Sequence, residues 1–336
     1  MCTCADADSA VYFFESTLPV TSRLELVAHL HAGWIIPASQ DHRSAQITRV
    51  GYLWHETIAE QFDELDRKDS MIGRAKMPLF EGVAVVTGAA SGIGRQVAVS
   101  FAREGCKRIA LLDKDDEGLS ETSRRCREAN GDTRTFVIEI DNRNEDDVSA
   151  GMEYVTEEWG RIDYAVNCAG MFGPKAPSHL LTTAEFDEIT TTNYRGTWLC
   201  SKAELSQMIK QEPLKTHDGR PGNRGVIVNV ASNLSLVSRP ETPAYSASKA
   251  AILSLTKSDA VDYAKYNIRI NCVCPGIIDT PMTSEVSTDD PIIAVAPMKR
   301  KGTPQEVADA VLFLCSSKAT FIHGAALSVD GGYVIN

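Results

Sequence analysis

A tyrosine and a lysine four residues apart are the pair in this sequence best suited to acid-base chemistry. Tyr245 and Lys249 stand in the stretch YSASK at the start of an expected helix over residues 245–266. A spacing of four places both side chains on one helix face. A phenol has an unperturbed pKa near ~10, so it is a poor base at neutral pH unless a cation such as Lys249 favours its anion. A tyrosine tuned in this way can exchange a proton with an alcohol oxygen.

Ser232 adds a third polar group to this pair. It lies 13 residues before Tyr245, just past the apolar run 226–230, which we expect to be a strand buried on both faces. Ligands collect at the carboxyl ends of parallel strands, so the hydroxyl of Ser232 would hold a substrate oxygen beside the phenol. A tyrosine and lysine pair on its own is typical of a solvated helix face, and the serine favours the chemical interpretation.

A glycine-rich stretch upstream has the composition of a phosphate-binding turn. Residues 87–94 read TGAASGIG, between a short apolar run and an expected helix over 93–103. A side chain at Gly88, Gly92 or Gly94 would strain the turn, block a pyrophosphate or hold the helix off the sheet. The helix start offers unpaired amides to phosphates. Many strand-to-helix turns contain glycines for steric reasons alone, so the context decides between the two interpretations.

An acidic residue supplies part of that context. Asp113 follows an expected strand over 108–112 and stands 25 positions after Gly88. This is close to the spacing at which a carboxylate accepts hydrogen bonds from an adenosine ribose. The two features together favour a dinucleotide site.

From Gly82 onward, apolar runs of strand length alternate with segments of helix length. Such alternation predicts right-handed crossovers, and therefore a Rossmann-type, doubly wound α/β fold with a seven-stranded parallel sheet and helices on both faces. The expected strands cover residues 83–86, 108–112, 135–140, 162–166, 226–230, 268–273 and 326–329. The expected helices cover residues 93–103, 117–130, 145–159, 183–209 with an interruption, 245–266 and 303–315, and a surface loop covers 212–224.

Residues 1–78 do not follow this alternation. Apolar side chains recur there at helical spacing in two sets, Leu24, Val27, Leu30 and Trp34, and then Trp54, Ile58, Phe62 and Leu65. We therefore expect a helical N-terminal extension over 1–78 and a catalytic domain over 79–336. A loosely ordered extension without a role in the chemistry is the alternative.

Composition and charge exclude several classes of function. The chain has 336 residues, 43% hydrophobic and 24% charged, without an apolar run of about 18 residues, so no membrane span is expected. The acidic N-terminus lacks the pattern of a secretory or mitochondrial leader, which favours a cytoplasmic protein. A net charge of −11 disfavours nucleic acid and anionic membranes as partners.

The nine cysteines do not form a metal-binding pattern. The pairs in Cys2-Thr3-Cys4 and Cys272-Val273-Cys274 have neither a second matched pair nor a histidine at ligand spacing, so we expect no metal. Four cysteines lie in apolar patterns and are expected to be buried reduced thiols. They are Cys106, Cys168, Cys200 and Cys315.

With these motifs in place, the sequence resembles a classical short-chain dehydrogenase/reductase. The matching motifs are TGAASGIG at 87–94, NCAG at 167–170, Asn193 in TTNYRG, Ser232 in NVAS, YSASK at 245–249, CPG at 274–276 and VDGG at 329–332. They fall in the family's order and approximate spacing over about 79–336. The resemblance implies an NAD(P)-dependent oxidoreductase that interconverts a secondary alcohol and a ketone by hydride transfer.

The resemblance also implies a role for each matching residue. Tyr245 would be the general acid/base, and Lys249 would lower its pKa and bind the nicotinamide ribose. Ser232 would polarise the carbonyl, and Asn193 would hold a water that links Lys249 to solvent. Asp113 would bind the adenosine ribose and Asp141 the adenine. The cofactor-binding residues would be Gly88, Ser91, Gly92, Ile93, Gly94, Asp113, Asp141, Asn142, Asn167, Ala169, Gly170, Tyr245, Lys249, Pro275, Gly276, Ile278 and Thr280.

NAD is the favoured cofactor. The extra phosphate of NADP would face the carboxylate of Asp113, and like charges at close range are unfavourable. NADP users of the family often carry a basic residue at the position of Ser91, but Lys114 beside Asp113 leaves NADP open. The resemblance further implies a homodimer or homotetramer formed through the helices around Asn193 and Tyr245.

The substrate-facing segments show departures from the family pattern. Ala231 and the stretch 233–235 replace residues that are usual around the catalytic serine, and His323 stands where the family often has threonine, with packing its expected role. Specificity should reside in 171–181 and 280–301, whose apolar residues favour a moderately apolar alcohol or ketone.

Two alternatives remain. The loop 212–224 resembles insertions in fungal members, which suits an NADPH-dependent ketoreductase of a biosynthetic, secondary-metabolite pathway. A non-redox nucleotide-binding scaffold is the other, although an intact set of four catalytic residues argues against it.

Overall fold

A parallel sheet of seven strands forms the centre of the structure, a computed structural model that describes residues 79–335. The two helices expected within residues 1–78 lie outside the described residues. The strand order is β3-β2-β1-β4-β5-β6-β7, so the expected seven-stranded, doubly wound fold is confirmed. The strands are β1 Val83–Thr87, β2 Arg108–Asp113, β3 Arg134–Glu139, β4 Tyr164–Asn167, β5 Gly225–Val230, β6 Ile268–Pro275 and β7 Ala326–Val329.

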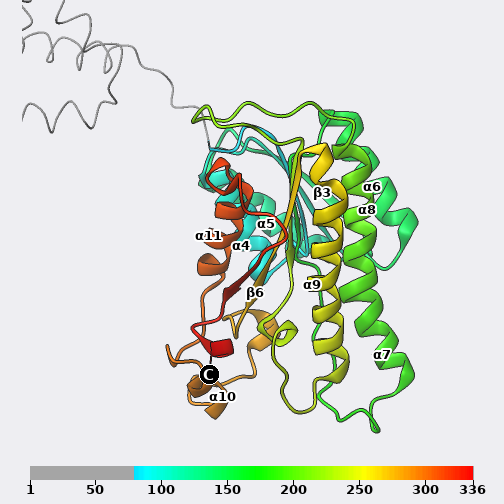
Figure 1. Cartoon of the computed structure of the whole chain (residues 1–336), viewed down its shortest axis with the longest axis vertical. Coiled ribbons are helices and arrows are strands. Elements are labelled where there is room, and N and C mark those ends of the chain that lie inside the picture. The colour runs from blue at the N-terminus through cyan, green and yellow to red at the C-terminus, as the bar shows by residue number, and fades with distance from the viewer. Residues whose placement is uncertain (1–78, 336) are drawn as a thin grey trace, which may run out of the picture. The chain divides into compact units, whose positions relative to one another are not determined.

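Helices cover both faces of this sheet (Figure 1). On one face lie α4 (Gly92–Arg103), α5 (Asp116–Ala129) and α11 (Pro304–Cys315), and on the other α6 (Glu145–Trp159), α8 (Gly196–Met208) and α9 (Pro243–Tyr263). Every residue of β1, β5 and β6 is buried. Strands covered on both faces are largely apolar, and the polar residues that β5 and β6 bury, Asn229, Arg269 and Asn271, form hydrogen bonds.

The carboxyl edge of the sheet contains a topological switch. Strand β1 pairs with β2 on one side and with β4 on the other, so the connections that follow β1 and β4 leave in opposite directions. A crevice forms where two such connections diverge. The register aligns Thr87 with Asn167 and Asn167 with Asn229, which brings the ends of β1, β4 and β5 to one edge.

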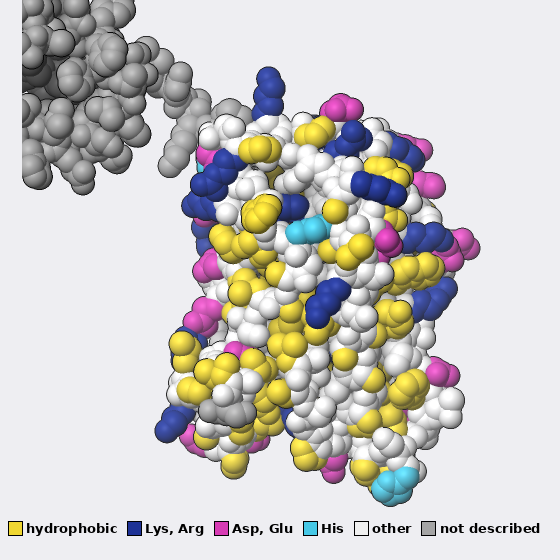
Figure 2. Space-filling model, in the orientation of Figure 1, with side chains coloured by type: hydrophobic (Ala, Val, Ile, Leu, Met, Phe, Trp, Pro, Cys, Tyr) yellow, Lys and Arg dark blue, Asp and Glu magenta, His cyan; other side chains and the backbone are white. Residues whose placement is uncertain are grey.

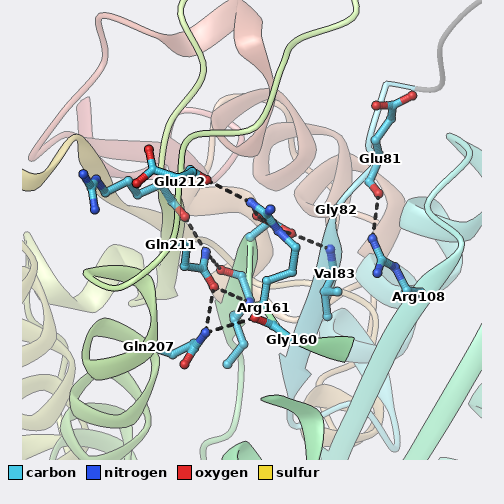
Figure 3. Close-up of polar contacts among 12 residues, drawn as sticks. Glu81, Gly82, Val83, Arg108, Gly160, Arg161, Gln207, Gln211 and Glu212 are labelled. Atoms are coloured by element: carbon cyan, nitrogen blue, oxygen red, sulfur yellow. Dashed lines mark hydrogen bonds and ion pairs between the residues drawn. The ribbon is translucent and has the colours of Figure 1, made fainter. Parts of the chain in front are cut away.

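A polar network fixes the opposite, amino-terminal edge of the sheet (Figure 3). Buried Asp163 accepts a hydrogen bond of 2.8 Å from the amide of Val83 and forms an ion pair of 2.7 Å with Arg161. The side-chain amide of Gln211 bonds both the N–H and the C=O of Ile162 at 2.7 Å. These contacts fix the amino-terminal ends of β1 and β4 relative to each other. They therefore also fix the relative positions of the carboxyl ends of these two strands.

The long helix expected over 183–209 is interrupted, as the sequence predicts. It consists of α7 (Thr183–Thr190), a π-helical turn Thr191–Arg195, and α8, which confirms the expected interruption. Strand β6 also extends beyond residue 273 to Pro275, because β7 pairs with it as far as Val329.

Two of the remaining expectations concern membranes and thiols. In the part of the chain that the structure describes, no helix has the length and hydropathy needed for a membrane span. Cys106, Cys200 and Cys315 are buried free thiols as expected, whereas Cys168 is half-buried and lines the cleft described below.

Candidate active site

A cleft of about 940 Å3 lies at the carboxyl ends of the strands. Its lining joins the glycine-rich turn, the ends of β2 and β4, and the start of α9. Three of the four predicted catalytic residues line it, namely Ser232, Tyr245 and Lys249. The predicted cofactor residues that line it are Gly88, Ser91, Gly92, Ile93, Gly94, Asp113, Asp141, Asn142, Ala169, Gly170, Tyr245, Lys249, Pro275, Gly276, Ile278 and Thr280. Asn167 and Asn193 are the two predicted residues outside this lining.

Glycines at the turn permit a close approach of backbones. Gly88 has a φ of 67°, and a Cβ on it would lie 2.7 Å from the amide nitrogen of Ala169. A Cβ on Gly94 would lie 2.1 Å from the carbonyl oxygen of Gly88. Neither clash involves a flexible side chain that could move aside, so the turn tolerates no larger residue at these two positions.

The N-terminus of α4 differs from those of its neighbours. Its N-cap residue, Ser91, makes no side-chain capping bond, and its first turn holds no acidic residue. By contrast, Asp115 and Asn144 cap α5 and α6, and acidic residues occupy the first turns of both helices. The positive end of the α4 dipole therefore faces the cleft without a negative partner from the helix itself, which suits a bound pyrophosphate.

The carboxylate of Asp113 is held in place by backbone amides at the end of β2. It accepts hydrogen bonds from Ala90 at 3.1 Å, from Lys114 at 2.8 Å and from Asp115 at 3.3 Å. A carboxylate fixed in this way keeps its charge at one place in the cleft.

Asp141 lines the cleft and forms an ion pair within the protein, and its expected contact with adenine stays a prediction. The guanidinium of Arg143 donates to both of its carboxylate oxygens, with Nε 3.0 and 2.9 Å away. These bonds are the largest cause that lowers the pKa of Asp141. Its carboxylate therefore already has a protein partner, and a direct bond from Asp141 to adenine would compete with Arg143.

The catalytic lysine is held by the sheet. Lys249 is only 4% exposed, and its Nζ donates a hydrogen bond of 2.8 Å to the carbonyl of Val230, the last residue of β5. The same Nζ lies 6.0 Å from the centre of the Tyr245 ring. Burial lowers the pKa of Lys249 to about 8. The side chain is thus positioned between the end of β5 and the phenol.

The pKa of Tyr245 is raised in this structure, whereas the sequence analysis expects a lowered pKa. Burial is the largest cause and raises this pKa, while a polar interaction with the Ser232 hydroxyl and the charge of Arg239 lower it by less. Lys249 is not among the groups that lower it. Burial therefore outweighs the nearby charges at this phenol, and the expected lowering of its pKa by Lys249 together with an oxidised nicotinamide stays a prediction.

Ser232 begins a short 3-10 turn, Asn233–Ser235, at the carboxyl end of β5. Its hydroxyl accepts a hydrogen bond of 3.1 Å from the amide of Leu234 and donates one of 3.2 Å to Asn233 Oδ1. These bonds fix the hydroxyl, which is 5% exposed, at the cleft beside the tyrosine.

Asn193 lies in the π-helical turn and is fully buried. Its side chain accepts from the amide of Met171 at 2.8 Å and donates to the Met171 carbonyl at 2.9 Å and to Ser248 at 3.0 Å. Its direct role is to join the loop after β4 to α9. Its expected role in holding a water stays a prediction.

Asn167 does not face the cleft with its side chain. Its amide nitrogen donates instead to Glu204 at 3.1 Å and to Asn229 at 3.1 Å, inside a buried polar cluster between β4, β5 and α8. The predicted contact with the cofactor is therefore corrected for this side chain, because its donors are used to hold the strand ends together.

Arg239 is a residue that the sequence reasoning missed. It lies in the loop between β5 and α9, and its guanidinium stands over the Phe172 ring at 5.1 Å. The Phe172 ring in turn tilts against Tyr245, with 4.6 Å between ring centres. No motif marks Arg239, and only the fold brings its loop against residue 172.

The His323 ring links two elements of the core. Its Nδ1 accepts a hydrogen bond of 3.2 Å from the amide of Ile270, and its Nε2 donates one of 2.6 Å to the carbonyl of Ala260. These contacts join β6 to α9 and agree with the packing role expected for this histidine.

Known proteins share this fold and these motifs. A family model described as enoyl-(acyl carrier protein) reductase matches residues 88–334. A 2-(R)-hydroxypropyl-CoM dehydrogenase of Xanthobacter autotrophicus is 43% identical over 257 residues, covering 75% of this chain and 98% of that protein.

Solved structures of dehydrogenases and reductases are also similar to this chain. The crystal structure of levodione reductase is 33% identical with a TM-score of 0.70, over 76% of this chain and 99% of the other. That of 3-ketoacyl-(acyl-carrier-protein) reductase from Brucella melitensis, complexed with NADH, is 31% identical with a TM-score of 0.67, over 76% and 99%. This chain therefore belongs to the short-chain dehydrogenase/reductase family, as an oxidoreductase of secondary alcohols or ketones that depends on a nicotinamide dinucleotide.

Proposed function

We propose that this protein interconverts a secondary alcohol and a ketone with NAD, and that Tyr245 transfers the proton. The observation that carries the proposal is the cleft itself, in which Ser232, Tyr245 and Lys249 line one continuous space with the glycine-rich turn. A bound nicotinamide dinucleotide supplies or accepts the hydride. The protein's own residues must then bind, orient and exchange a proton with the substrate oxygen.

The residues at the turn fit such a cofactor. The uncapped start of α4 offers amides to a pyrophosphate, and the close backbone approach at Gly88 and Gly94 leaves that face of the turn without side chains. Asp113 would accept bonds from the adenosine ribose, and Lys249 would hold the nicotinamide ribose.

The phenol of Tyr245 would move the proton. Its raised pKa keeps it protonated at neutral pH, and a protonated phenol is the form that donates to a ketone oxygen. The hydroxyl of Ser232 would hold that oxygen beside the phenol. In the direction of alcohol oxidation the same groups would act in reverse.

The preference for NAD rests on Asp113. Its carboxylate, fixed by three backbone amides, would face the additional phosphate of NADP at close range. The exposed Lys114 next to it supports the second candidate, an NADPH-dependent ketoreductase, because it could partly neutralise that phosphate.

The experiment that tests the function follows absorbance at the reduced-nicotinamide band. The protein is mixed with NADH or with NADPH and a panel of cyclic and linear ketones. We expect loss of the band with at least one ketone, and faster loss with NADH. A protein that bound NADH yet oxidised it with none of the ketones would support the scaffold alternative instead.

A further inference from the structure

An arginine without an acidic partner lies beside the predicted catalytic tyrosine. The side chain of Arg239 lines the cleft and is half-buried. Its backbone carbonyl accepts a hydrogen bond of 3.0 Å from Thr242, but among residues 79–335 no carboxylate or carbonyl accepts from its guanidinium. A guanidinium has five N–H donors, so this side chain can hydrogen-bond a bound ligand without breaking a contact inside the protein.

The stacking of this guanidinium orients its donors. Its Cζ lies 5.1 Å from the centre of the Phe172 ring, and a guanidinium over a ring face keeps N–H donors available for another partner. Because Phe172 also contacts Tyr245, the guanidinium stands one aromatic ring away from the phenol. An anion bound by Arg239 would therefore lie a short distance from the reacting oxygen.

The loops around this arginine form a wall of the cleft. The amide of Ala176 donates a hydrogen bond of 3.1 Å to the carbonyl of Glu241, which joins the loop after β4 to the loop before α9. Lys175 on the first of these loops lines the cleft as well.

The acidic residues of the lining do not cancel these two cations. Asp113, Asp115 and Asp141 belong to the cofactor end, and Glu188 pairs with Arg143 at 3.6 Å. The exposed Glu285 also lines the cleft, but it forms no ion pair with a described residue. Arg239 and Lys175 thus have no ion-pair partner among the described residues, and two such cations in a chain of net charge −11 favour a site for an anion.

We propose that Arg239 binds an oxyanionic group, a carboxylate or a sulfonate, on the substrate. This inference rests on the proposed function and narrows it, since the substrates become ketones and secondary alcohols that carry an acid group a few bonds from the reacting carbon. The planar guanidinium fits such a group with two parallel hydrogen bonds.

The kinetic test compares each acid with its own uncharged ester. Acetoacetate, levulinate and the next longer homologue are assayed beside their methyl esters, with cyclohexanone as a neutral ketone. We expect higher kcat/KM for at least one acid than for its ester. Arg239→Gln should lower kcat/KM for that acid by about 10- to 100-fold, mostly through KM, because a charged hydrogen bond is lost. The loss for the ester and for cyclohexanone should be much smaller, limited to the effect of the Arg239 charge on the pKa of Tyr245, and Arg239→Lys should restore part of the loss for the acid.

Calorimetry gives a readout that does not depend on turnover. Pentanoate, pentanesulfonate and pentanamide are titrated into the protein saturated with NAD, and the two anions should bind more tightly than the amide. Arg239→Gln should remove that difference, whereas Arg125→Gln, the same charge change on an exposed face of α5, should not. Tighter binding of pentanesulfonate than of pentanoate would assign the substrate group to a sulfonate.

The outcomes separate this inference from the proposed function. Equal use of acids and esters with equal binding of anions and amide would overturn the role of Arg239 while turnover of ketones continued. A uniform loss for acids, esters and cyclohexanone in Arg239→Gln would show that the residue only supports the fold of its loop, and would also overturn the inference.

Discussion

Burial and nearby charges together determine the pKa values of single residues at the catalytic end of the cleft. Burial raises the pKa of Tyr245, while Ser232 and Arg239 lower it by less. For Lys249 burial acts in the other direction and lowers the pKa to about 8, so the ammonium form still predominates at neutral pH. A protonated phenol beside a charged lysine is the arrangement that suits proton donation to a ketone.

We expect one carboxylate, that of Asp113, to determine the preference for NADH over NADPH. Asp113→Ala should raise kcat/KM for NADPH relative to NADH by about tenfold, because removing a partly exposed like charge is worth about 1 to 2 kcal/mol. Initial rates with both cofactors measure this ratio. Asp116→Ala, which removes an exposed charge outside the cleft, serves as the control. An unchanged ratio in Asp113→Ala would exclude this carboxylate from cofactor selection.

At the scale of elements, the turn between β1 and α4 depends on a contact between two glycines. Gly94→Ala would place a Cβ 2.1 Å from the Gly88 carbonyl, so α4 must shift away from the turn. We expect weaker binding of NADH and a loss of about 1 to 3 kcal/mol in the free energy of unfolding. Titration of NADH fluorescence and urea unfolding measure the two effects.

Gly131→Ala provides the matched comparison, because a Cβ there would meet no atom within 4 Å. It should leave both NADH binding and stability close to those of the natural protein. If Gly94→Ala bound NADH as tightly as Gly131→Ala does, the close contact at the turn would not be needed for the cofactor.

The packing of α8 against β4 contains a buried carboxyl group. Glu204 is fully buried, and desolvation raises its pKa to about 8 although Asn167 donates to it. Among the described residues, Glu204 Oε1 and Asn167 Oδ1 have no hydrogen-bond partner. The folded protein therefore holds a proton on Glu204 across a range of pH in which the unfolded chain does not.

This proton links stability to pH. Between roughly pH 5 and pH 8 the folded state binds a proton that the unfolded state has lost, so the contribution of Glu204 to stability falls as pH rises, by up to about 1.4 kcal/mol per pH unit. Glu204→Gln should therefore stabilise the protein more at about pH 8 than at about pH 5. Urea unfolding at both pH values measures the difference, with Glu158→Gln on the exposed face of α6 as control. Equal effects at both pH values would mean that Glu204 does not titrate in this range.

The sequence predicted the elements of the fold well, because the spacing of apolar residues and the residues that end helices and strands are local features of the sequence. All seven expected strands are present, and β7 covers residues 326–329 as expected. The glycine turn and the Tyr245 and Lys249 pair were also visible, since each lies within one short stretch. The burial of a side chain depends on segments far apart in the sequence, so the sequence did not show that burial raises the pKa of Tyr245.

Contacts between distant segments set the limit of the sequence reasoning. Nothing local shows that Arg143 engages Asp141, that Asn167 points into the core toward Glu204, or that Arg239 stacks on Phe172. Each depends on loops that only the folded sheet brings together.

At the scale of the whole molecule, the exposed apolar side chains bear on assembly. Trp198 on α8 and Val261 on α9 are 41% and 79% exposed, on the helices through which a homodimer or homotetramer was expected. Apolar side chains also gather near α10 (Pro291–Val295) and the C-terminal segment (Figure 2). Exposed apolar surface of this kind is typical of subunit contacts, and the homodimer or homotetramer stays a prediction.

The catalytic domain should function without the N-terminal extension. Phe80 belongs to the core of this domain, because it is fully buried with its ring centre 4.9 Å from that of Phe101, and the described residues of the cleft all follow it in the sequence. A chain that begins at Met77 should therefore fold and keep the kcat/KM of the full chain. Steady-state kinetics and sedimentation of both chains measure activity and oligomeric state. A folded but inactive short chain would show that residues before 77 contribute to the site.

Proton transfer by the phenol of Tyr245 is the central claim, and one substitution tests it most directly. Tyr245→Phe keeps the ring that contacts Phe172 and removes only the hydroxyl. With a ketone that the natural protein reduces, kcat should fall by about 10² to 10⁴-fold while the Kd for NADH, from fluorescence titration, stays the same. A variant that bound NADH normally and still reduced the ketone at the natural rate would contradict the account.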